Sequence, residues 1–239
     1  MGQGAGARRT EPSVGMRIIC DFDGTITPQD TTDRVLEALA DPAWRDLEAQ
    51  WVATEISASD CMRQQVALIG GGQAELDAVL DGTALDRGFI AFVAWAEHRG
   101  IPVEVVSDGV DYFITRILTR HGLAHLPVTA NHLTGEPGAW RLEQPWSRKG
   151  CAAGSGVCKC EVTGPWNGER PTIAYVGDGR SDFCVSGRVD HLFAKGALAD
   201  YATARGQAFE AFETFHDVTR ALARLTGGLP LSAARAASL

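Results

Sequence analysis

Three clusters of polar residues in the sequence have the composition of a site that binds a divalent cation and a phosphate group. They are Asp21-Phe22-Asp23-Gly24-Thr25, Ser107-Asp108-Gly109 and Gly177-Asp178-Gly179-Arg180-Ser181-Asp182. Carboxylates crowded together repel one another unless a cation neutralises them or one of them is protonated. Oxygen ligands favour Mg²⁺ over zinc, and a bound cation would attract a phosphate. The clusters therefore predict a magnesium site, provided that the fold brings them together.

Each cluster directly follows a short apolar run that is typical of a buried β-strand. These runs span 17–20, 103–106 and 172–176, and residues 192–194 could form a fourth strand. The apolar spacing at 85–99 and 109–121 predicts helices between the strands. Strands that alternate with helices indicate a parallel sheet covered on both faces, and such sheets bind ligands at the carboxyl ends of their strands. We therefore expect a doubly wound α/β fold in which the three clusters meet in one crevice.

The segment 30–81 shows helical spacing of its apolar residues and no strand pattern. We interpret it as a small helical cap, inserted after the first strand into an α/β core formed by 16–29 and 82–230. The alternative is that these helices flank the main sheet. Residues 1–15 are expected to be a mobile leader and residues 231–239 a frayed tail.

Composition and charge exclude several classes of protein. Of the 239 residues, 45% are hydrophobic and 22% charged, which are ordinary values for a globular protein. No apolar stretch approaches the ~20 residues of a membrane span, and the first residues lack the apolar region of a secretory signal. The net charge of -8, without a long basic run, argues against a nucleic-acid partner. Six cysteines without a signal peptide indicate a reducing compartment, so we expect a cytoplasmic protein without a membrane partner.

In this order, the clusters resemble motifs of the haloacid dehalogenase superfamily. The run that begins at Asp21 resembles the first motif, Ser107 the second, and the run that contains Asp178 the fourth. The third motif is a lysine, for which Lys149 and Lys159 both qualify by position. We prefer Lys159, because a cysteine-rich loop precedes it, as in the phosphatases of 2-hydroxy-3-keto-5-methylthiopentenyl-1-phosphate. Vertebrate phosphocholine and phosphoethanolamine phosphatases have a similar loop, so this resemblance leaves the substrate open. The position of the cap is similar to that in phosphoserine phosphatase.

The resemblance implies a magnesium-dependent phosphatase that acts on a small phosphorylated metabolite. It implies that Asp21 is the nucleophile that forms a phosphoaspartate, with Asp23 as general acid and base. The implied magnesium ligands are Asp21, the backbone carbonyl of Asp23, Asp178 and Asp182. The implied phosphate-binding residues are Thr25, Ser107, Asp108, Gly109 and Lys159, of which the lysine also stabilises the transition state.

Several alternatives to a small-molecule phosphatase stay open at the level of sequence. Superfamily members that act as dehalogenases or ATPases generally lack an acid at the position of Asp23, which this chain has. A phosphomutase keeps that acid and is therefore compatible with the sequence. A protein phosphatase and a non-catalytic, phosphate-binding regulatory module are further alternatives.

The cysteine-rich loop offers a second possible metal site. Cys151, Cys158 and Cys160 lie within ten residues of one another and adjoin Lys159, and thiolates suit zinc. A structural zinc ion would hold this loop rigid. The spacing lacks paired CxxC units and no fourth ligand is obvious, so the alternative is that these cysteines are free or disulfide-bonded.

Overall fold

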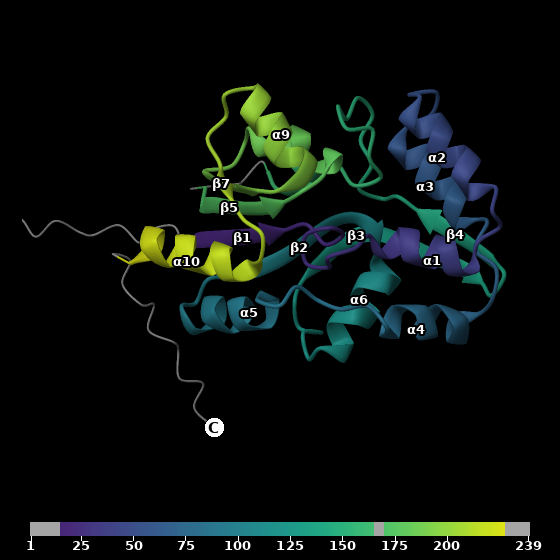
Figure 1. Ribbon diagram of the computed structural model, residues 1–239, viewed down its shortest axis with the longest axis horizontal. Helices are drawn as coiled ribbons and strands as arrows, with labels where there is room; N and C mark the ends of the chain where they lie inside the picture. Colours follow the sequence, from purple (N-terminus) through teal and green to yellow (C-terminus); the bar gives the residue numbers. More distant parts are fainter. Residues whose placement is uncertain (1–14, 165–169, 228–239) are drawn as a thin grey trace, which may run out of the picture.

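The computed structural model describes residues 15–164 and 170–227, so the predicted leader and tail lie outside the described residues apart from Gly15 (Figure 1). Within these residues, strands form one sheet in the order β4-β3-β2-β1-β5-β6-β7. They are β1 (Met16–Cys20), β2 (Val103–Val110), β3 (Val128–Glu136), β4 (Ala139–Glu143), β5 (Thr172–Gly177), β6 (His191–Ala194) and β7 (Glu210–Ala211). All neighbouring strands pair in parallel except β3 and β4, which are antiparallel.

Helices cover both faces of this sheet (Figure 1). They are α1 (Thr31–Leu39), α2 (Trp44–Val52), α3 (Ala58–Val66), α4 (Gln73–Asp81), α5 (Phe89–His98), α6 (Asp111–Arg120), α7 (Lys159–Val162), α8 (Phe183–Ser186), α9 (Gly196–Ala204) and α10 (Phe215–Thr226), with a short 3-10 turn at Arg180–Asp182. The predicted fold class, a doubly wound α/β fold with a parallel sheet, is confirmed, and β4 adds an antiparallel edge strand that we did not predict.

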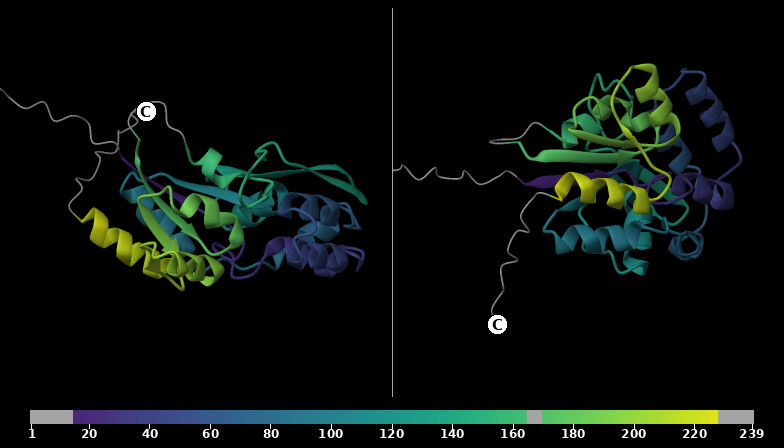
Figure 2. Two further views of the ribbon diagram at one scale, coloured as in Figure 1. Left: turned by 90° about the horizontal axis from the view of Figure 1, so that it is seen from above. Right: turned by 60° about the vertical axis from the view of Figure 1, so that its left-hand side comes forward.

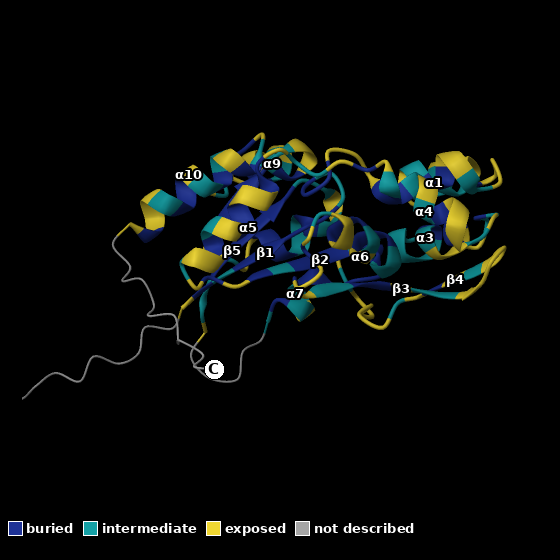
Figure 3. Cartoon of the chain, turned by 90° about the horizontal axis from the view of Figure 1, so that it is seen from below, coloured by how far each residue is buried: buried dark blue, intermediate teal, exposed yellow. Residues whose placement is uncertain are grey.

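The sheet separates two apolar clusters, and successive side chains of a strand point alternately into one and the other. Ile18 and Cys20 of β1 face the cluster that contains the apolar sides of α5, α6 and α10. Ile19, between them, faces the smaller cluster that contains α8 and α9. Successive side chains of a strand point to opposite faces, so a strand covered on both sides must be apolar throughout. The central strands are accordingly buried along most of their length (Figure 3).

The helices α1 to α4 lie at one end of the sheet with no strand of the sheet among them (Figure 1). Their apolar residues Leu36, Leu76 and Leu80 belong to the same buried cluster as Ile18 of β1. The antiparallel β3–β4 hairpin extends beside these helices, and α3 contacts β4 (Figure 2). No helix within 15–164 or 170–227 is long and apolar enough to cross a membrane.

The structure corrects two helix boundaries and adds a hairpin that we did not predict. The helix predicted at 85–99 begins only at Phe89, because the Asp86 carboxylate accepts hydrogen bonds from the backbone N–H groups of Gly88 and Phe215, both at 2.9 Å. The helix predicted at 109–121 begins at Asp111, since β2 continues to Val110. The hairpin turns at Pro137-Gly138, where Gly138 has a φ of 77°, and this Pro-Gly pair is the signal that could have predicted it.

Candidate active site

The carboxyl ends of β1, β2 and β5 bring the three polar clusters into one crevice. Asp21 directly follows β1, and its backbone N–H donates to the carbonyl of Val176 in β5 at 2.9 Å. One carboxylate oxygen each of Asp21, Asp178 and Asp182 lies within 4.8 Å of the others. Residues more than 150 positions apart in sequence therefore form one acidic group at the edge of the sheet.

Lys159 is the cation at the centre of this group. Its side chain is fully buried, and its ammonium lies 2.8 Å from the Asp21 Oδ1 and 2.6 Å from Asp182 Oδ1. It also donates to the Ser181 hydroxyl at 2.9 Å. Lys149, the other candidate by position, is exposed on the surface. The structure thus brings Lys159 to the predicted nucleophile.

The two carboxylate oxygens of Asp21 differ, because only one of them accepts hydrogen bonds within the described part of the chain. Its Oδ1 accepts hydrogen bonds from the Lys159 ammonium and from the backbone N–H of Phe22 at 2.7 Å. Among the described residues, Oδ2 has no hydrogen-bond partner. The carboxylate is therefore oriented through one oxygen while the other stays available for a ligand or for bond formation.

Asp182 is fully buried and held from all sides. Its Oδ1 accepts hydrogen bonds from the Tyr175 hydroxyl and from Lys159, both at 2.6 Å. Its Oδ2 accepts from the backbone N–H groups of Asp178 and Gly179, at 3.1 and 3.0 Å. Such a carboxylate fixes the shape of the loop that carries Asp178.

The electrostatics of the group favour a cation. Burial raises the pKa of Asp21 well above its ordinary value, and the charges of Asp182 and Asp178 raise it further, whereas Lys159 opposes them. Burial likewise raises the pKa of Asp178. Burial alone would lower the pKa of Lys159, but Asp182 and Asp21 outweigh it, so that pKa is raised. Lys195 also acts on Asp178, but less than Lys159 does, and the two lysines face three carboxylates, so the site retains negative charge that a divalent cation would neutralise.

Asp23 lines the same cavity as Asp21 and Asp178. Its Oδ1 accepts hydrogen bonds from the backbone N–H of Thr31, at 2.8 Å, and from the Thr31 hydroxyl. Burial raises the pKa of Asp23 to about 6, although the two hydrogen bonds from Thr31 partly oppose this shift. Its Oδ2 approaches Gly109 so closely that a Cβ at that position would lie 2.4 Å away. The glycine of the second cluster is therefore required by the position of Asp23.

Thr25 and Gly24 support Asp178. The buried Thr25 hydroxyl donates to Asp178 Oδ1 at 2.6 Å. Gly24 has a φ of 72°, and a Cβ there would lie 2.3 Å from Asp178 Oδ2. In this structure Thr25 thus orients a predicted magnesium ligand, while its predicted contact with phosphate stays a prediction.

The second cluster contributes hydrogen-bond donors. The buried Ser107 hydroxyl accepts from the backbone N–H of Gly109 at 3.0 Å, which leaves its own proton free to donate. The side chain of Asp108 accepts a hydrogen bond from the backbone N–H of Val157 at 2.9 Å. The Asp108 carboxylate thus contacts the chain that leads into Lys159, and its predicted role in phosphate binding stays a prediction.

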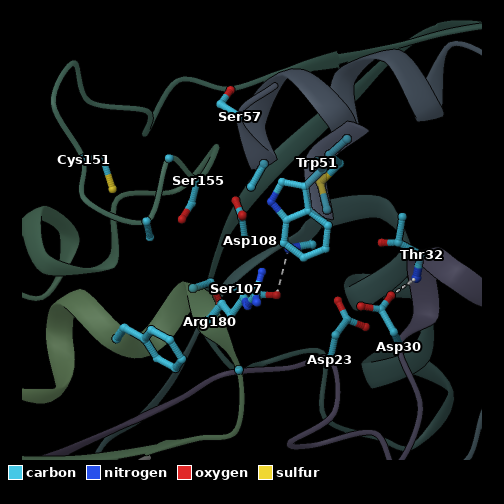
Figure 4. Close-up of a pocket in the computed structure, with 18 of the residues that line it drawn as sticks. Asp23, Asp30, Thr32, Trp51, Ser57, Ser107, Asp108, Cys151, Ser155 and Arg180 are labelled. Carbon is cyan, nitrogen blue, oxygen red and sulfur yellow. Dashed lines mark hydrogen bonds between the residues drawn. The ribbon is translucent and has the colours of Figure 1, made fainter. Parts of the chain in front are cut away.

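A cavity of about 960 Å³ opens above these residues. Its floor contains Asp21, Asp23, Ser107 and Asp178, and its walls come from α2, α3 and the loop 151–155. Figure 4 shows Trp51 of α2 projecting into the middle of this cavity, between Asp23 and the cysteine-rich loop. The guanidinium of Arg180 lies 5.7 Å from the centre of the Trp51 ring. The cavity is much larger than a phosphate group and has room for an attached organic group.

The cysteines predicted as a zinc site do not gather around one point. The Cys151 thiol contacts that of Cys158, whereas the Cys160 thiol contacts that of Cys184. Among the described residues, the acidic group around Asp21 is the only set of three or more potential ligands within 4.8 Å of one another. All six cysteines are free. The zinc prediction therefore finds no support in this arrangement.

The sequence profile of the haloacid dehalogenase-like hydrolases matches residues 18–186, which include every residue of the crevice described above. The chain belongs to this family. The predicted resemblance is confirmed, and the matched segment begins in β1 and ends in α8.

Curated relatives within the haloacid dehalogenase-like family extend over most of the chain. A 2-hydroxy-3-keto-5-methylthiopentenyl-1-phosphate phosphatase of Geobacillus kaustophilus is 30% identical over 214 residues, which is 87% of this chain and 96% of the relative. One of Brevibacillus brevis is 29% identical and covers 86% and 94%. A solved phosphoserine phosphatase with an analogue of its phospho-aspartyl intermediate superposes with a TM-score of 0.64 at 17% identity, covering 88% and 99%. These relatives confirm that the chain is an enzyme of the phosphatase type.

Sequence reasoning missed several residues that complete the crevice of this family member. They are Thr31, Asn131, Tyr175 and Ser181, which contact Asp23, Asp108, Asp182 and Lys159 respectively. Ser181 lies inside the fourth motif, so its position was a usable signal. The other three are single polar residues within otherwise unremarkable helix or strand patterns, and only the fold brings them to the site.

Proposed function

We propose that this protein is a magnesium-dependent phosphomonoesterase that hydrolyses a small phosphorylated metabolite through a phosphoaspartate on Asp21. The observation that carries the proposal is the buried Asp21 carboxylate, held by Lys159 through one oxygen and open at the other, on the floor of the cavity. A carboxylate fixed in this way needs little reorganisation to attack a bound phosphoryl group.

The donor set at the crevice fits Mg²⁺. The Asp21 and Asp178 carboxylates and the Asp23 backbone carbonyl would hold the ion, with Asp182 acting directly or through a water molecule. All of these donors are oxygens, which hard cations prefer. When bound, Mg²⁺ would neutralise charge on the phosphoryl oxygens and orient the group for in-line attack.

The chain's own residues supply the remaining chemistry. Asp21 Oδ2 would attack phosphorus while Asp23 donates a proton to the leaving oxygen, and Asp23 would then deprotonate the water that hydrolyses the acyl phosphate. The Ser107 hydroxyl and backbone N–H groups near Gly109 would donate to phosphoryl oxygens. Lys159 would stabilise the developing charge and keep Asp21 ionised among its acidic neighbours.

The names of the relatives suggest one candidate substrate, 2-hydroxy-3-keto-5-methylthiopentenyl-1-phosphate. The cavity is large enough for its chain, and Trp51, Ile56 and Met62 in the cavity wall would contact apolar parts of a leaving group. Phosphoserine and the phosphate esters of choline and ethanolamine are the alternatives. Six free cysteines support a reducing compartment such as the cytoplasm.

Hydrolysis of p-nitrophenyl phosphate tests the reaction without knowledge of the natural substrate. We expect turnover with Mg²⁺ and its loss with EDTA, restored by excess Mg²⁺. Binding of phosphate without turnover under any of these conditions would instead favour a non-catalytic binding module. A parallel assay of the candidate esters named above would then identify the preferred substrate by its kcat/KM.

A further inference from the structure

The phosphate-binding cluster Ser107-Asp108-Gly109 leaves the regular hydrogen-bond ladder of the sheet. Strand β2 pairs with β3 through Val106 and Thr129, and again through Val110 and Asn131. Three residues of β2 therefore oppose a single residue of β3, which makes an enlarged β-bulge. The backbone carbonyls inside the bulge need other partners, because buried carbonyls are rarely left unpaired.

The side chain of Asn131 supplies those partners. Asn131 is fully buried on β3, and its amide nitrogen donates to the carbonyl of Asp108 and lies 3.2 Å from the carbonyl of Gly109. The same nitrogen lies 3.3 Å from Asp108 Oδ1. One amide group thus replaces the strand contacts that the bulge removes.

The contacts of Asn131 determine which polar groups of the bulge face the crevice. A carbonyl oxygen that faced the crevice would repel a phosphoryl oxygen, whereas N–H groups and hydroxyls attract it. Because Asn131 holds the Asp108 and Gly109 carbonyls on the side of β3, the Ser107 hydroxyl, which accepts from the Gly109 N–H, stays on the side of Asp23 with its own proton free to donate. The geometry is that of an anion site whose acceptors are turned away.

The Asp108 carboxylate connects the bulge to the chain segment that leads into Lys159. Its Oδ1 accepts from the backbone N–H of Val157, two residues before Lys159. The Gly156 N–H donates to the same carboxylate, and a Cβ at Gly156 would lie 2.4 Å from Asn131 Oδ1. The bulge, β3 and the chain that leads into Lys159 therefore meet at Asn131.

We propose that Asn131 is a positioning residue of the phosphoryl site, which orients the Ser107–Gly109 donors toward the phosphate group and aligns them with Lys159. Asn131 does not touch the substrate; it acts through Asp108 and Gly109. The inference rests on the proposed function, since it assigns Asn131 to the binding of the transferred phosphoryl group.

Two substitutions test the proposal. Asn131→Leu keeps a similar volume without donors, and Asn131→Ala removes the side chain. For each folded variant we expect the inhibition constant of inorganic phosphate to rise about tenfold, the size of one lost hydrogen bond of about 1.4 kcal/mol. KM should rise with it and kcat should fall. The loss in kcat/KM should be the same for p-nitrophenyl phosphate and for an alkyl phosphate, because both present the same phosphoryl group.

A merely structural role would give a different result. It would lower the melting temperature and the active fraction, and so kcat, while KM and the phosphate inhibition constant stay within twofold of wild type. That outcome in either folded variant would overturn the proposal. Leu133→Ala is the matched control, because Leu133 lies on β3 and packs against the core away from the crevice. It should lower the melting temperature without changing phosphate inhibition.

Calorimetric titration with inorganic phosphate and Mg²⁺ separates this proposal from the proposed function. If the wild-type protein binds phosphate but hydrolyses no ester, the proposed function fails, and weaker binding by the Asn131 variants still supports the positioning role. Equal binding by wild type and variants would overturn it whether or not the protein has activity.

Discussion

At the scale of single residues, the carboxylates of the crevice are held by different kinds of partner. Asp21 shares a lysine with Asp182, whereas Asp23 accepts hydrogen bonds from the backbone N–H and the hydroxyl of Thr31. Two neighbouring aspartates of one motif thus receive different partners. This difference suits one of them to attack as an anion and the other to carry a proton.

Substitution of Asp23 tests the assignment of the proton donor. Asp23→Asn keeps the backbone carbonyl but loses the acidic proton, so phosphorylation of the enzyme should slow least for leaving groups of low pKa. Single-turnover rates with p-nitrophenyl phosphate and with an alkyl phosphate measure this difference. An equal loss with both esters would count against Asp23 as the general acid.

Substitution of Lys159 should cost stability as well as activity. Lys159→Met leaves Asp21 and Asp182 buried without their cation, and breaking a buried ion pair in this way costs about 3–5 kcal/mol. Chemical denaturation measures this loss. The double variant Lys159→Met/Asp182→Asn removes one of the two stranded charges and should recover part of the stability. If Lys159→Met is as stable as wild type, the buried ion pairs of Lys159 do not contribute to stability, which would contradict this prediction.

The residues that sequence could identify share one property. Asp21 and Asp178 directly follow buried apolar strands, and Ser107 follows the apolar run 103–106 within β2, so in each case a polar residue stands where an apolar run stops. Asn131 and Tyr175 lie inside strands whose pattern explains them without any function. Their contacts depend on strand order and on the bulge in β2, which local sequence does not encode.

At the scale of elements, the positions of the central strands were predictable, but the end of β2 and several connections were not. The helix expected to begin at 85 starts later because Asp86 contacts the first turn of α10, far along the chain. The β3–β4 hairpin is polar on much of its surface, so its apolar pattern is weak, although Pro137-Gly138 marks its turn. The first difference arises from a tertiary contact, whereas the hairpin has a local signal in its turn and only a weak one in its strands.

The segment 30–81 stays a predicted cap, and its four helices offer a direct test. If it closes over the cavity, hydrogen exchange in α2 and α3 should slow when beryllofluoride and Mg²⁺ bind as a phosphoryl analogue. Helix α10, which lies outside the cavity, is the internal control and should not change. Protection confined to residues 21–25, 107–109 and 177–182 would mean that the segment is part of a rigid scaffold.

At the scale of the whole molecule, one apolar cluster extends from the sheet into the helices α1 to α4. In the same cluster, Phe215 of α10 packs against Phe89 and Phe92 of α5, with ring centres 4.8 and 4.9 Å apart. Aromatic rings at these separations contribute both burial and favourable edge contacts. Helix α10 therefore closes the apolar core beside α5.

Removal of this ring should affect folding without affecting the crevice. Phe215→Ala is expected to lower the free energy of unfolding by about 3–5 kcal/mol, the usual cost of deleting a buried Phe side chain. Urea denaturation measures the loss, and KM for p-nitrophenyl phosphate should stay unchanged in the folded variant. A large change in KM would show that α10 is coupled to the active site.

The central claim is that the phosphoryl group passes through Asp21. A single turnover of the Mg²⁺-loaded enzyme with a substrate ester, quenched in acid and followed by peptide mass spectrometry, tests it most directly. We predict that a phosphoryl group appears on the peptide that contains Asp21 before phosphate is released, and that Asp21→Asn abolishes both, with a loss of several orders of magnitude in kcat. Turnover without any phosphorylated peptide, or with the phosphoryl group on another residue, would contradict the account.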